Sequence, residues 1–327
     1  MAIMKAYWIR NTGTTTELFL RDLPQPQPNA GQMLVRMRAT SLNRGDMLAR
    51  IKRHSAADGR PAGIDGSGEV VSVGANVTDF KPGERVLFRA HACFAEYAVV
   101  EPPLAARMPD RLSWEQAAAL PAAYITAWEA IVEFGRARAG EWVLLCGVSS
   151  GVGVAALQIA KSLGARVIGT SGSAIKLAKL KALGLDVGIE GRGGAFVDAV
   201  LQATGGKGVN VAVNLVGGSA FPGCVRVAAD FGRVIIVGYV DGEMHPEFDL
   251  EAVHGRRLQI SGISNTPLTP AQRAASMQGF MRDVYPALEL GFIAPLVDRV
   301  FDFDELPAAK AYVDTDQFLG KVVVRMP

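Results

Sequence analysis

The sequence has 327 residues, of which 49% are hydrophobic and 20% are charged, and its formal net charge at pH 7 is +2. The length favours two domains, the composition is that of an ordinary globular protein, and the charge predicts neither a nucleic-acid surface nor strong membrane attraction. No apolar run approaches the roughly 18 residues of a membrane span, and the N-terminus lacks the apolar core of a secretion signal. We therefore expect a cytoplasmic protein with no nucleic-acid or membrane partner.

The first third of the chain is rich in short β-like runs separated by turns. Residues 33–40 alternate apolar and polar side chains, which is typical of a half-buried strand. A proline-rich connector precedes them, and the runs 68–74, 84–90 and 95–100 continue the pattern. This region therefore predicts an all-β barrel.

Helix signals replace this pattern after residue 112. Ser113 and Gln116 have the spacing of a capping box, which predicts a helix start, and Pro121 limits that helix. A second helix over residues 123–134 is expected to end at Gly135.

From residue 142 onward, nearly continuous apolar runs alternate with helices that end at glycines. Strands are expected at residues 142–148, 165–171, 186–190, 209–216, 232–239 and 258–264, with helices that include 153–164 and 175–184. Buried strands joined by helical crossovers indicate a parallel sheet that is covered on both faces.

The tail contains a helix within residues 271–291, followed by strands at 296–303 and 320–326. These last strands resemble those of the opening barrel more than those of the parallel sheet. We therefore expect the tail to return to the first domain.

The stretch "CGVSSGVG", residues 146–153, passes directly from a strand into a glycine turn and a helix. This is the context of a dinucleotide fingerprint, because the helix N-terminus offers free amides and a positive dipole end to a pyrophosphate. The usual G-x-G-x-x-G is incomplete, since Val148 and Ser150 occupy the first two glycine positions. The alternative is a tight turn without a ligand. The residues expected to bind the cofactor here are Ser149, Ser150, Gly151, Val152 and Gly153.

The second strand of the parallel sheet bears on the choice of cofactor. Sites that prefer NAD place an acid about 20 residues past the fingerprint, but residues 167–176 contain none. Ser171, Ser173 and Lys176 can bind a 2′-phosphate instead, with Arg192 as a further cation. The sequence therefore predicts NADPH, although Lys176 alone is equally well explained as a solvated surface charge.

The three cysteines, Cys93, Cys146 and Cys224, lie far apart and form no CxxC pair. They suggest no disulfide framework. Cys146 lies in an apolar strand and is interpreted as a small core residue.

Five segments in order resemble the medium-chain dehydrogenase/reductase superfamily, and specifically its zinc-independent quinone oxidoreductase branch. They are residues 23–50 with an Asn-x-x-Asp motif, the glycine-rich 63–86, the linker helix 120–131, the nucleotide turn 147–170 and the closing strand 320–324. The resemblance implies an α/β fold, with a Rossmann-type doubly wound parallel sheet at 122–264 and a GroES-like β-barrel domain at 1–121 and 265–327. It also implies an active site in the cleft between these domains.

Two positions argue against a metal. The resembled zinc enzymes have a cysteine where this sequence has Asn43 and a histidine where it has Ile64. The four histidines, His54, His91, His245 and His254, have no ligand-like spacing. We expect no metal site, which makes simple alcohol dehydrogenation an unsuitable reaction.

The expected reaction is hydride delivery from NADPH to an acceptor that is already electrophilic, a quinone or an α,β-unsaturated carbonyl. The resemblance places the Asn43 amide at the nicotinamide–substrate cleft, where it can stabilise a developing negative charge. Asn43 is otherwise explained as a turn residue. Tyr124 is the second expected catalytic residue, as a phenolic donor, and its alternative is a structural tyrosine.

The resemblance also completes the expected cofactor site. Thr126 matches a position near the nicotinamide ribose, and Gly191 replaces an aromatic residue near the 2′-phosphate, whereas Arg192 is retained. Tyr239 is a further phenolic donor near the cleft. The remaining residues expected to bind the cofactor are Asn214, Gly238 and Lys321.

Several questions stay open at this point. The basic segment 50–60 is interpreted as a solvated loop, but it can also attract the phosphates of a coenzyme A thioester, which favours a 2-enoyl thioester reductase. A third possibility is a non-enzymatic protein that binds NADPH for sensing. The apolar run 258–264 suggests an edge strand that pairs with its copy in a homodimer.

Overall fold

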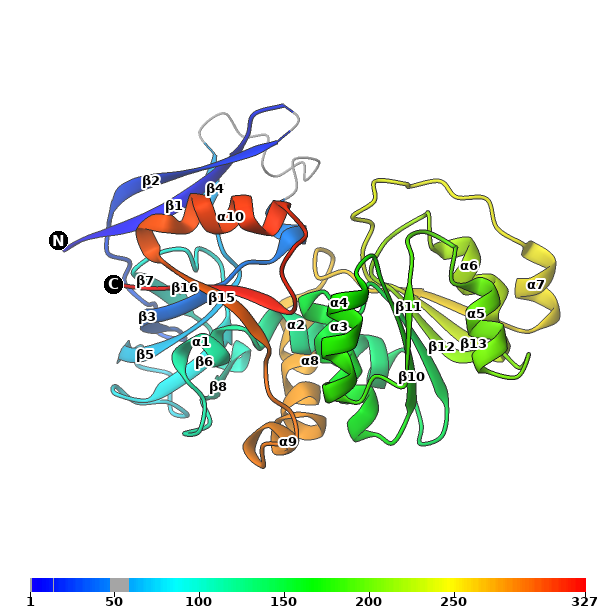
Figure 1. Ribbon diagram of the computed structural model, residues 1–327. Coiled ribbons are helices and arrows are strands. Elements are labelled where there is room, and N and C mark those ends of the chain that lie inside the picture. The colour runs from blue at the N-terminus through cyan, green and yellow to red at the C-terminus, as the bar shows by residue number, and fades with distance from the viewer. Residues whose placement is uncertain (1, 14, 48–58) are drawn as a thin grey trace. The chain divides into compact units, whose positions relative to one another are not determined.

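The computed structural model describes residues 2–13, 15–47 and 59–327 (Figure 1). The chain forms two compact units: unit 1 comprises Met1–Ala122, Arg273–Met281 and Ala294–Pro327, and unit 2 comprises Ala123–Gln272 and Arg282–Ile293. The sequence assigned all of 265–327 to the first domain, whereas parts of that stretch group with unit 2. None of the described helices is both long and apolar enough to cross a membrane.

Unit 1 is built mainly from antiparallel strands in two sheets. The smaller sheet has the order β2-β1-β4, with β1 (Ile3–Asn11), β2 (Thr16–Pro24) and β4 (Arg60–Pro61). The larger sheet has the order β15-β16-β3-β5-β6-β8, and β7 pairs with β3. Its strands are β3 (Met33–Ser41), β5 (Asp65–Val73), β6 (Arg85–Arg89), β7 (Tyr97–Val100), β8 (Ala105–Arg107), β15 (Val297–Asp302) and β16 (Lys321–Arg325).

The C-terminal segment of the chain completes the larger sheet of unit 1. β16 lies antiparallel to β3, with Val323 opposite Ser41, and β15 runs parallel to β16. This confirms the prediction that the last strands return to the first part of the chain. Between them lies α10 (Leu306–Asp314), a helix that the sequence analysis did not predict.

The two predicted helix signals behave differently. Ser113 and Gln116 form the expected capping box of α1 (Trp114–Ala118), so that prediction is confirmed. α1 ends before Pro121, as predicted, and Pro121 begins α2 (Pro121–Trp128), where a proline needs no N–H partner. A π-helical turn (Glu129–Glu133) follows, and Phe134 rather than Gly135 is its C-cap.

Unit 2 contains a six-stranded parallel sheet with the order β11-β10-β9-β12-β13-β14. Its strands are β9 (Trp142–Cys146), β10 (Arg166–Ser171), β11 (Val187–Glu190), β12 (Val209–Asn214), β13 (Ala228–Ile236) and β14 (Gln259–Gly262). Five of them fall within the predicted runs, whereas β13 begins four residues before the predicted 232–239. The chain starts in the middle, moves outward to β11, and then continues from β12 on the other side of β9.

Helices cover both faces of this sheet (Figure 1). α3 and α4 pack on β9, β10 and β11, whereas α6 packs on β12 and β13. The helices of the unit are α3 (Gly151–Ser162), α4 (Ala174–Leu180), α5 (Val197–Ala203), α6 (Phe221–Val227), α7 (Leu250–Gly255) and α9 (Tyr285–Glu289); α2 and α8 (Pro270–Asp283) contribute residues to both units. This is the doubly wound arrangement, and ligands bind such sheets where the strand order reverses, here between β9 and β12.

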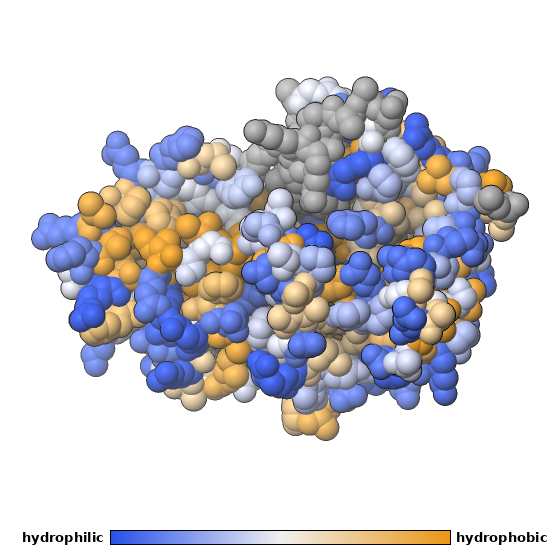
Figure 2. Space-filling view, turned by 180° about the vertical axis from the view of Figure 1, so that it is seen from behind, coloured by the Kyte–Doolittle hydropathy of each residue, from blue (hydrophilic) through white to orange (hydrophobic). Residues whose placement is uncertain are grey.

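The strand β14 forms one edge of the sheet, and Ile260 on it is 37% exposed. Leu250, Phe248 and Phe231 are further large apolar residues with exposed side chains in unit 2. Figure 2 shows hydrophobic residues gathered at the left of the view. Pairing of this edge with a second copy of the chain stays a prediction.

The third glycine of the turn, Gly153, is required by close packing. A Cβ placed on Gly153 would lie 2.5 Å from the carbonyl oxygen of Gly147 and 2.7 Å from the backbone of Val148. Backbone atoms cannot move aside as a flexible side chain can. Helix α3 therefore begins this close to the end of β9 only because residue 153 has no side chain.

We expect Gly153→Ala to lower the free energy of unfolding by about 1–3 kcal/mol, the usual cost of overpacking. The matched control is Gly255→Ala in α7, where a Cβ meets no atom within 4 Å. Since alanine favours helix over glycine, the control is expected to be neutral or stabilising by up to about 1 kcal/mol. Urea denaturation of both variants checks this, and equal effects would contradict the packing argument.

Candidate functional site

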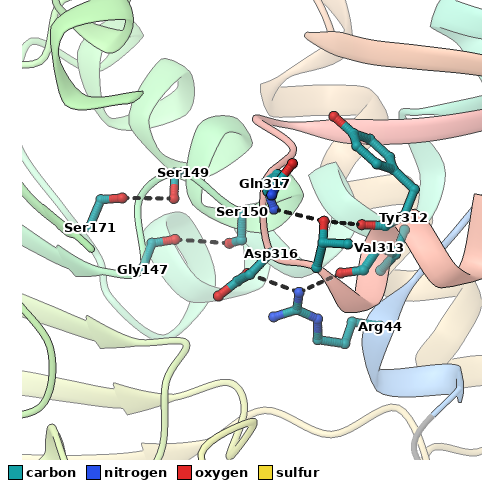
Figure 3. A network of polar contacts seen from close by, with 10 residues as sticks. Arg44, Gly147, Ser149, Ser150, Ser171, Tyr312, Val313, Asp316 and Gln317 are labelled. Atoms are coloured by element: carbon teal, nitrogen blue, oxygen red, sulfur yellow. Dashed lines mark hydrogen bonds and ion pairs between the residues drawn. The ribbon is translucent and has the colours of Figure 1, made fainter. Parts of the chain in front are cut away.

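The turn between β9 and α3 is held by its own hydrogen bonds. The Ser150 hydroxyl donates to the Gly147 carbonyl (2.9 Å) and accepts from the Gly153 backbone N–H (3.1 Å), so Ser150 is the N-cap of α3 (Figure 3). Gly147 has a φ of +85°, which favours glycine. Gly151 and Val152 supply the first-turn amides at the positive end of the helix dipole.

A pair of serines joins this turn to the neighbouring strand. The hydroxyls of Ser149 and Ser171 lie 3.1 Å apart, with Ser171 at the end of β10 (Figure 3). The backbone N–H of Val148 also donates to the carbonyl of Thr170 (3.0 Å). The predicted Ser149 and Ser171 therefore lie together beside the turn, where hydroxyls can hydrogen-bond a phosphate.

The loop after β10 carries the residues that were expected to bind a 2′-phosphate. Ser173 is the N-cap of α4, and its hydroxyl accepts the backbone N–H of Lys176 (3.4 Å). The exposed Arg192 lies against Gly172, because a Cβ on Gly172 would be 3.0 Å from the Arg192 Nε. A cation is thus present at the end of β10.

An acid also reaches this loop, and the sequence analysis missed it. The carboxylate of Glu190, the last residue of β11, accepts the backbone N–H of Ala174 (3.4 Å). Residues 172–185, which directly follow β10, contain no acid, but the adjacent strand supplies one. Its place at the carboxyl end of a neighbouring parallel strand is the signal that would have found it.

The loops after β12 and β13 are tied to each other. The Asn214 amide is used within its own loop, accepting from the backbone N–H groups of Val216 (2.9 Å) and Gly217 (3.0 Å) and donating to the Gly217 carbonyl (2.8 Å). The predicted Asn214 is fully buried and shapes this loop. The Gly238 N–H donates to the Asn214 carbonyl (3.4 Å), and Tyr239 beside it is 48% exposed.

Asp241 links these two loops. Its carboxylate accepts the backbone N–H (2.9 Å) and the hydroxyl (2.6 Å) of Ser219, and the backbone N–H of Glu243 (3.1 Å). Partial burial raises the pKa of Asp241, but these hydrogen bonds outweigh it and leave the pKa below its usual value. The ionised carboxylate therefore stabilises the loop pair.

The two residues predicted on α2 lie in different surroundings. Tyr124 is only 2% exposed, and its hydroxyl accepts from the Gln158 amide on α3 (3.1 Å). Burial raises the pKa of Tyr124. This is the position of a structural tyrosine rather than of the accessible phenolic donor that was expected. Thr126, by contrast, is half-buried.

Unit 1 contains a buried polar cluster, which we call the Lys321 cluster: Ser41, Asn43, Asp65 and Lys321. Asp65 is fully buried, and its carboxylate accepts from the Ser41 hydroxyl (2.9 and 3.1 Å), the Asn43 amide (3.1 Å) and the Ala122 backbone N–H (3.1 Å). Lys321 donates to the Asn43 amide oxygen (2.7 Å). The cluster thus joins the end of β3 to the first residues of β5 and β16.

This geometry bears on the roles predicted for Asn43 and Lys321. The Asn43 amide nitrogen donates to Asp65 and, at 3.4 Å, to the Ser41 carbonyl, so its N–H groups are already engaged. Lys321 is 5% exposed and also donates to the Leu42 carbonyl (2.9 Å), and its expected binding of the cofactor stays a prediction. Asp65 was not predicted at all, although it is the only charged residue in "GIDGSG".

The two charges of the cluster are perturbed in opposite senses. Burial raises the pKa of Asp65, and the ammonium of Lys321 and the hydroxyl of Ser41 act against that rise. Burial lowers the pKa of Lys321, and the charge of Asp65 acts against that fall. Each charge therefore supports the ionised form of the other in a region from which water is excluded.

The residue after Asn43 fixes the segment that precedes Lys321. Arg44 donates to the Val313 carbonyl at the end of α10 (2.8 Å) and to the Asp316 carboxylate (2.9 Å) (Figure 3). Its guanidinium also lies 5.6 Å from the centre of the Phe318 ring. Because Arg44 holds both the helix end and the following loop, it positions the start of β16.

Two predictions fall partly or wholly outside the described residues. His54 and most of the basic segment 50–60 lie there, so their roles stay predictions. Among the residues that the structure does describe, no group of three or more His, Cys, Asp or Glu side chains is placed to hold a metal ion.

Comparison with known proteins agrees with this architecture. Residues 29–110 match the family described as "Alcohol dehydrogenase GroES-like domain", and residues 151–277 match the one described as "Zinc-binding dehydrogenase". A putative alcohol dehydrogenase from Sinorhizobium meliloti 1021 is 30% identical, with 99% of each chain covered and a TM-score of 0.83. This chain belongs to the medium-chain dehydrogenase/reductase superfamily. Its fold is the predicted one, a Rossmann-like parallel sheet with a GroES-like domain.

Other matches of this superfamily member are parts of far larger proteins. The highly reducing polyketide synthase gloL of Glarea lozoyensis is 29% identical over 94% of this chain but only 12% of its own length. The chain spans between 5% and 15% of the curated relatives that it matches. The CurK enoyl reductase shares the fold, with a TM-score of 0.85, 23% identity, and 98% of this chain and 99% of that chain covered.

The nicotinamide dinucleotide that the superfamily uses fits unit 2. The turn at Ser150 supplies first-turn amides, Gly153 brings α3 close to β9, and Ser149 and Ser171 add hydroxyls beside it. This arrangement lies where the strand order reverses, at the carboxyl ends of the strands. The turn is thus suited to the nicotinamide coenzyme that the superfamily uses.

We expect Asp241→Asn to lower the free energy of unfolding at pH 7 by about 1 kcal/mol or less, since this site is exposed. Because the folded-state pKa of Asp241 lies below the usual 3.8, its contribution is complete above that pH and is lost as the pH falls through the lowered pKa. The gap between variant and wild type should therefore close in acid.

Urea denaturation across pH checks this. Asp230→Asn, at an exposed aspartate on β13, is the control and is expected to change little at any pH. A gap for Asp241→Asn that stays constant into strong acid would contradict a role for its charge.

Proposed function

We propose that this chain is an NADPH-dependent, zinc-independent reductase of α,β-unsaturated acyl thioesters. The observation that carries the coenzyme part is the Arg192 guanidinium, which lies against Gly172 at the end of β10, beside the turn of α3. A guanidinium binds a phosphate through charge-assisted hydrogen bonds. A 2′-phosphate is what distinguishes NADPH from NADH, so a cation at this place favours NADPH.

The negative charge of Glu190 weakens the expected preference for NADPH over NADH but does not remove it. Its carboxylate is held by the backbone N–H of Ala174 at the start of α4, so it is directed to that helix. Ser171 and Ser173 carry no charge that would repel a phosphate. The balance of one cation and two hydroxyls against one engaged carboxylate supports the phosphorylated coenzyme.

The names of related proteins support an enoyl substrate. One relative is called a highly reducing polyketide synthase, and one protein of the same fold is called an enoyl reductase. A double bond conjugated to a carbonyl is already electrophilic at its β-carbon, so hydride can add to it without a metal. This chemistry suits a chain in which Asn43 and Ile64 stand at the two positions discussed above for zinc ligands.

The bound coenzyme supplies hydride, and the chain supplies the rest. The turn of α3 and the serines beside it hold the pyrophosphate, and the loops joined by Asp241 shape the carboxyl edge of the sheet. As hydride reaches the β-carbon, the double-bond electrons move onto the carbonyl oxygen and give an enolate. Water then returns one proton to the α-carbon, which completes a two-electron reduction.

We expect the purified chain to oxidise NADPH with an enoyl thioester and to do so more efficiently than with quinones or free enones. The panel contains 2-enoyl-coenzyme A, the matching N-acetylcysteamine thioester, a free α,β-unsaturated ketone and two quinones. A kcat/KM at least about tenfold higher for the thioesters supports the proposal. A quinone that exceeds the thioesters would overturn it in favour of the quinone oxidoreductase branch.

The same panel decides two further questions. If NADPH binds in calorimetry but no acceptor is reduced, the chain is a non-enzymatic coenzyme-binding protein and the proposal fails. If the coenzyme A thioester is preferred over the N-acetylcysteamine thioester, the chain recognises the coenzyme A moiety. Stoichiometric zinc that is needed for turnover would overturn the metal-free part.

We expect Arg192→Ala to weaken NADPH binding about 10- to 100-fold, which corresponds to the loss of a charged hydrogen bond of about 1.5–3 kcal/mol. NADH affinity should change little, because NADH has no 2′-phosphate. Arg166→Ala is the matched control, since Arg166 is an exposed arginine at the opposite end of β10. Calorimetry with both coenzymes checks this, and equal losses for NADPH and NADH would contradict a phosphate contact.

A further inference from the structure

The Lys321 cluster contains a buried ammonium. Lys321 is 5% exposed and lies at the first position of β16 in unit 1. Burying an unsolvated charge costs several kcal/mol unless neighbours compensate for it. A residue kept at that cost calls for a role.

The neighbours hold the ammonium in one position. Its two acceptors are the Leu42 carbonyl at 2.9 Å and the Asn43 amide oxygen at 2.7 Å. An ammonium has three N–H groups, and among the described residues these two acceptors account for two of them. The third meets no acceptor among those residues, so it can donate to a bound substrate.

Asn43 sets the orientation of the whole cluster. Its amide oxygen accepts from Lys321 while its amide nitrogen donates to Asp65. The reverse orientation would place an N–H group against the ammonium and an oxygen against the carboxylate, so only one orientation satisfies both charges. The amide dipole therefore lies between the two charges and keeps them apart, and no salt bridge within 4 Å joins them.

We propose that the Lys321 ammonium donates a hydrogen bond to the carbonyl oxygen of the substrate as the enolate forms, and that Asn43 and Asp65 position it. This inference rests on the proposed reductase function. Lys321 keeps its proton throughout: the hydride carries its two electrons to the β-carbon, the negative charge moves to the oxygen, and water supplies the proton at the α-carbon. The coenzyme leaves oxidised.

The physical reason is preorganisation. A cation that its neighbours already hold in place loses no free energy to reorientation when charge appears on the substrate. In a site that excludes water, the attraction between an ammonium and an enolate oxygen is stronger than in solution. The Asn43 amide, which the sequence analysis assigned to this task, has both of its N–H groups engaged, so the ammonium is the better donor.

The decisive variant removes both charges together. Lys321→Met alone leaves Asp65 buried without a counter-charge, which is strongly destabilising. The double variant Lys321→Met/Asp65→Asn keeps the interior neutral, so its effect on turnover is separated from the charge imbalance. Lys81→Met, at an exposed lysine of unit 1, is the control for loss of an ammonium.

We expect the double variant to fold, to bind NADPH with an unchanged Kd, and to reduce the best acceptor of the panel with a kcat about 100- to 1,000-fold lower. KM should change much less, because the contact strengthens as negative charge develops. Asn43→Ala, which removes one acceptor but keeps the cation, should lower kcat by a smaller factor.

Three results would overturn the assignment. One is a double variant whose kcat stays close to that of the wild type, which would make the cluster purely structural. Another is a weakened NADPH affinity at unchanged kcat, which would make Lys321 a coenzyme ligand. If the double variant does not fold, the kcat values of Lys321→Arg and Lys321→Gln are compared instead, because only arginine keeps the charge. Equal kcat values for these two variants would overturn the proposal.

These outcomes are distinct from failure of the proposed function. That failure appears in the wild-type chain, as absence of enoyl reduction. If the wild type prefers a quinone, the thioester proposal fails, yet a kcat loss in the double variant would still assign the Lys321 ammonium to the reduced carbonyl.

Discussion

The pairing of β16 with β3 is the contact on which the polar centre of unit 1 depends. It places Val323 opposite Ser41 and therefore brings Lys321, two residues earlier, beside the chain that leaves β3. The Leu42 N–H donates to the Val322 carbonyl (3.0 Å), which continues the contact past the end of the strand. Without the last strand of the chain, the Asn43 amide oxygen would lack the cation that donates to it, and Asp65 would lack the opposite charge of Lys321. Lys321 and Asn43, which lie far apart in the sequence, thus belong to one hydrogen-bonded cluster.

The side chain that stands between the two charges of this cluster is the amide of Asn43. Two opposite charges buried in direct contact often gain little over apolar residues, because desolvation cancels their attraction. Here an amide stands between them and satisfies both, while the Ser41 hydroxyl and the Ala122 N–H complete the coordination of Asp65. Because Asp65 is not a direct hydrogen-bond partner of Lys321, it does not occupy any N–H group of the ammonium. A tight ion pair would have been simpler to bury, but it would have had less positive charge to offer a third partner.

Local patterns of the sequence were sufficient for most of unit 2. Its strands are apolar runs of ordinary length, and in unit 1 the Ser113–Gln116 spacing predicted the start of α1. What could not be predicted depends on residues far apart in the chain. Glu190 reaches the start of α4 only because β11 lies beside β10, and Asp65 meets Lys321 only because β16 returns to β3. Tyr124 and Asn214 were singled out by type and position, but burial decided what they contact.

The incomplete glycine motif illustrates the same principle on a smaller scale. The middle glycine of a dinucleotide turn lets the backbone approach the phosphates, and this chain has Ser150 there instead. The serine takes on a different task, since its hydroxyl closes the turn by bonding Gly147 on one side and Gly153 on the other. A turn that is fixed by a side chain needs fewer glycines to be ordered. It still needs Gly153, because the backbone of α3 approaches β9 too closely at that residue for any side chain to fit. The one glycine that packing requires is therefore the one that the sequence keeps.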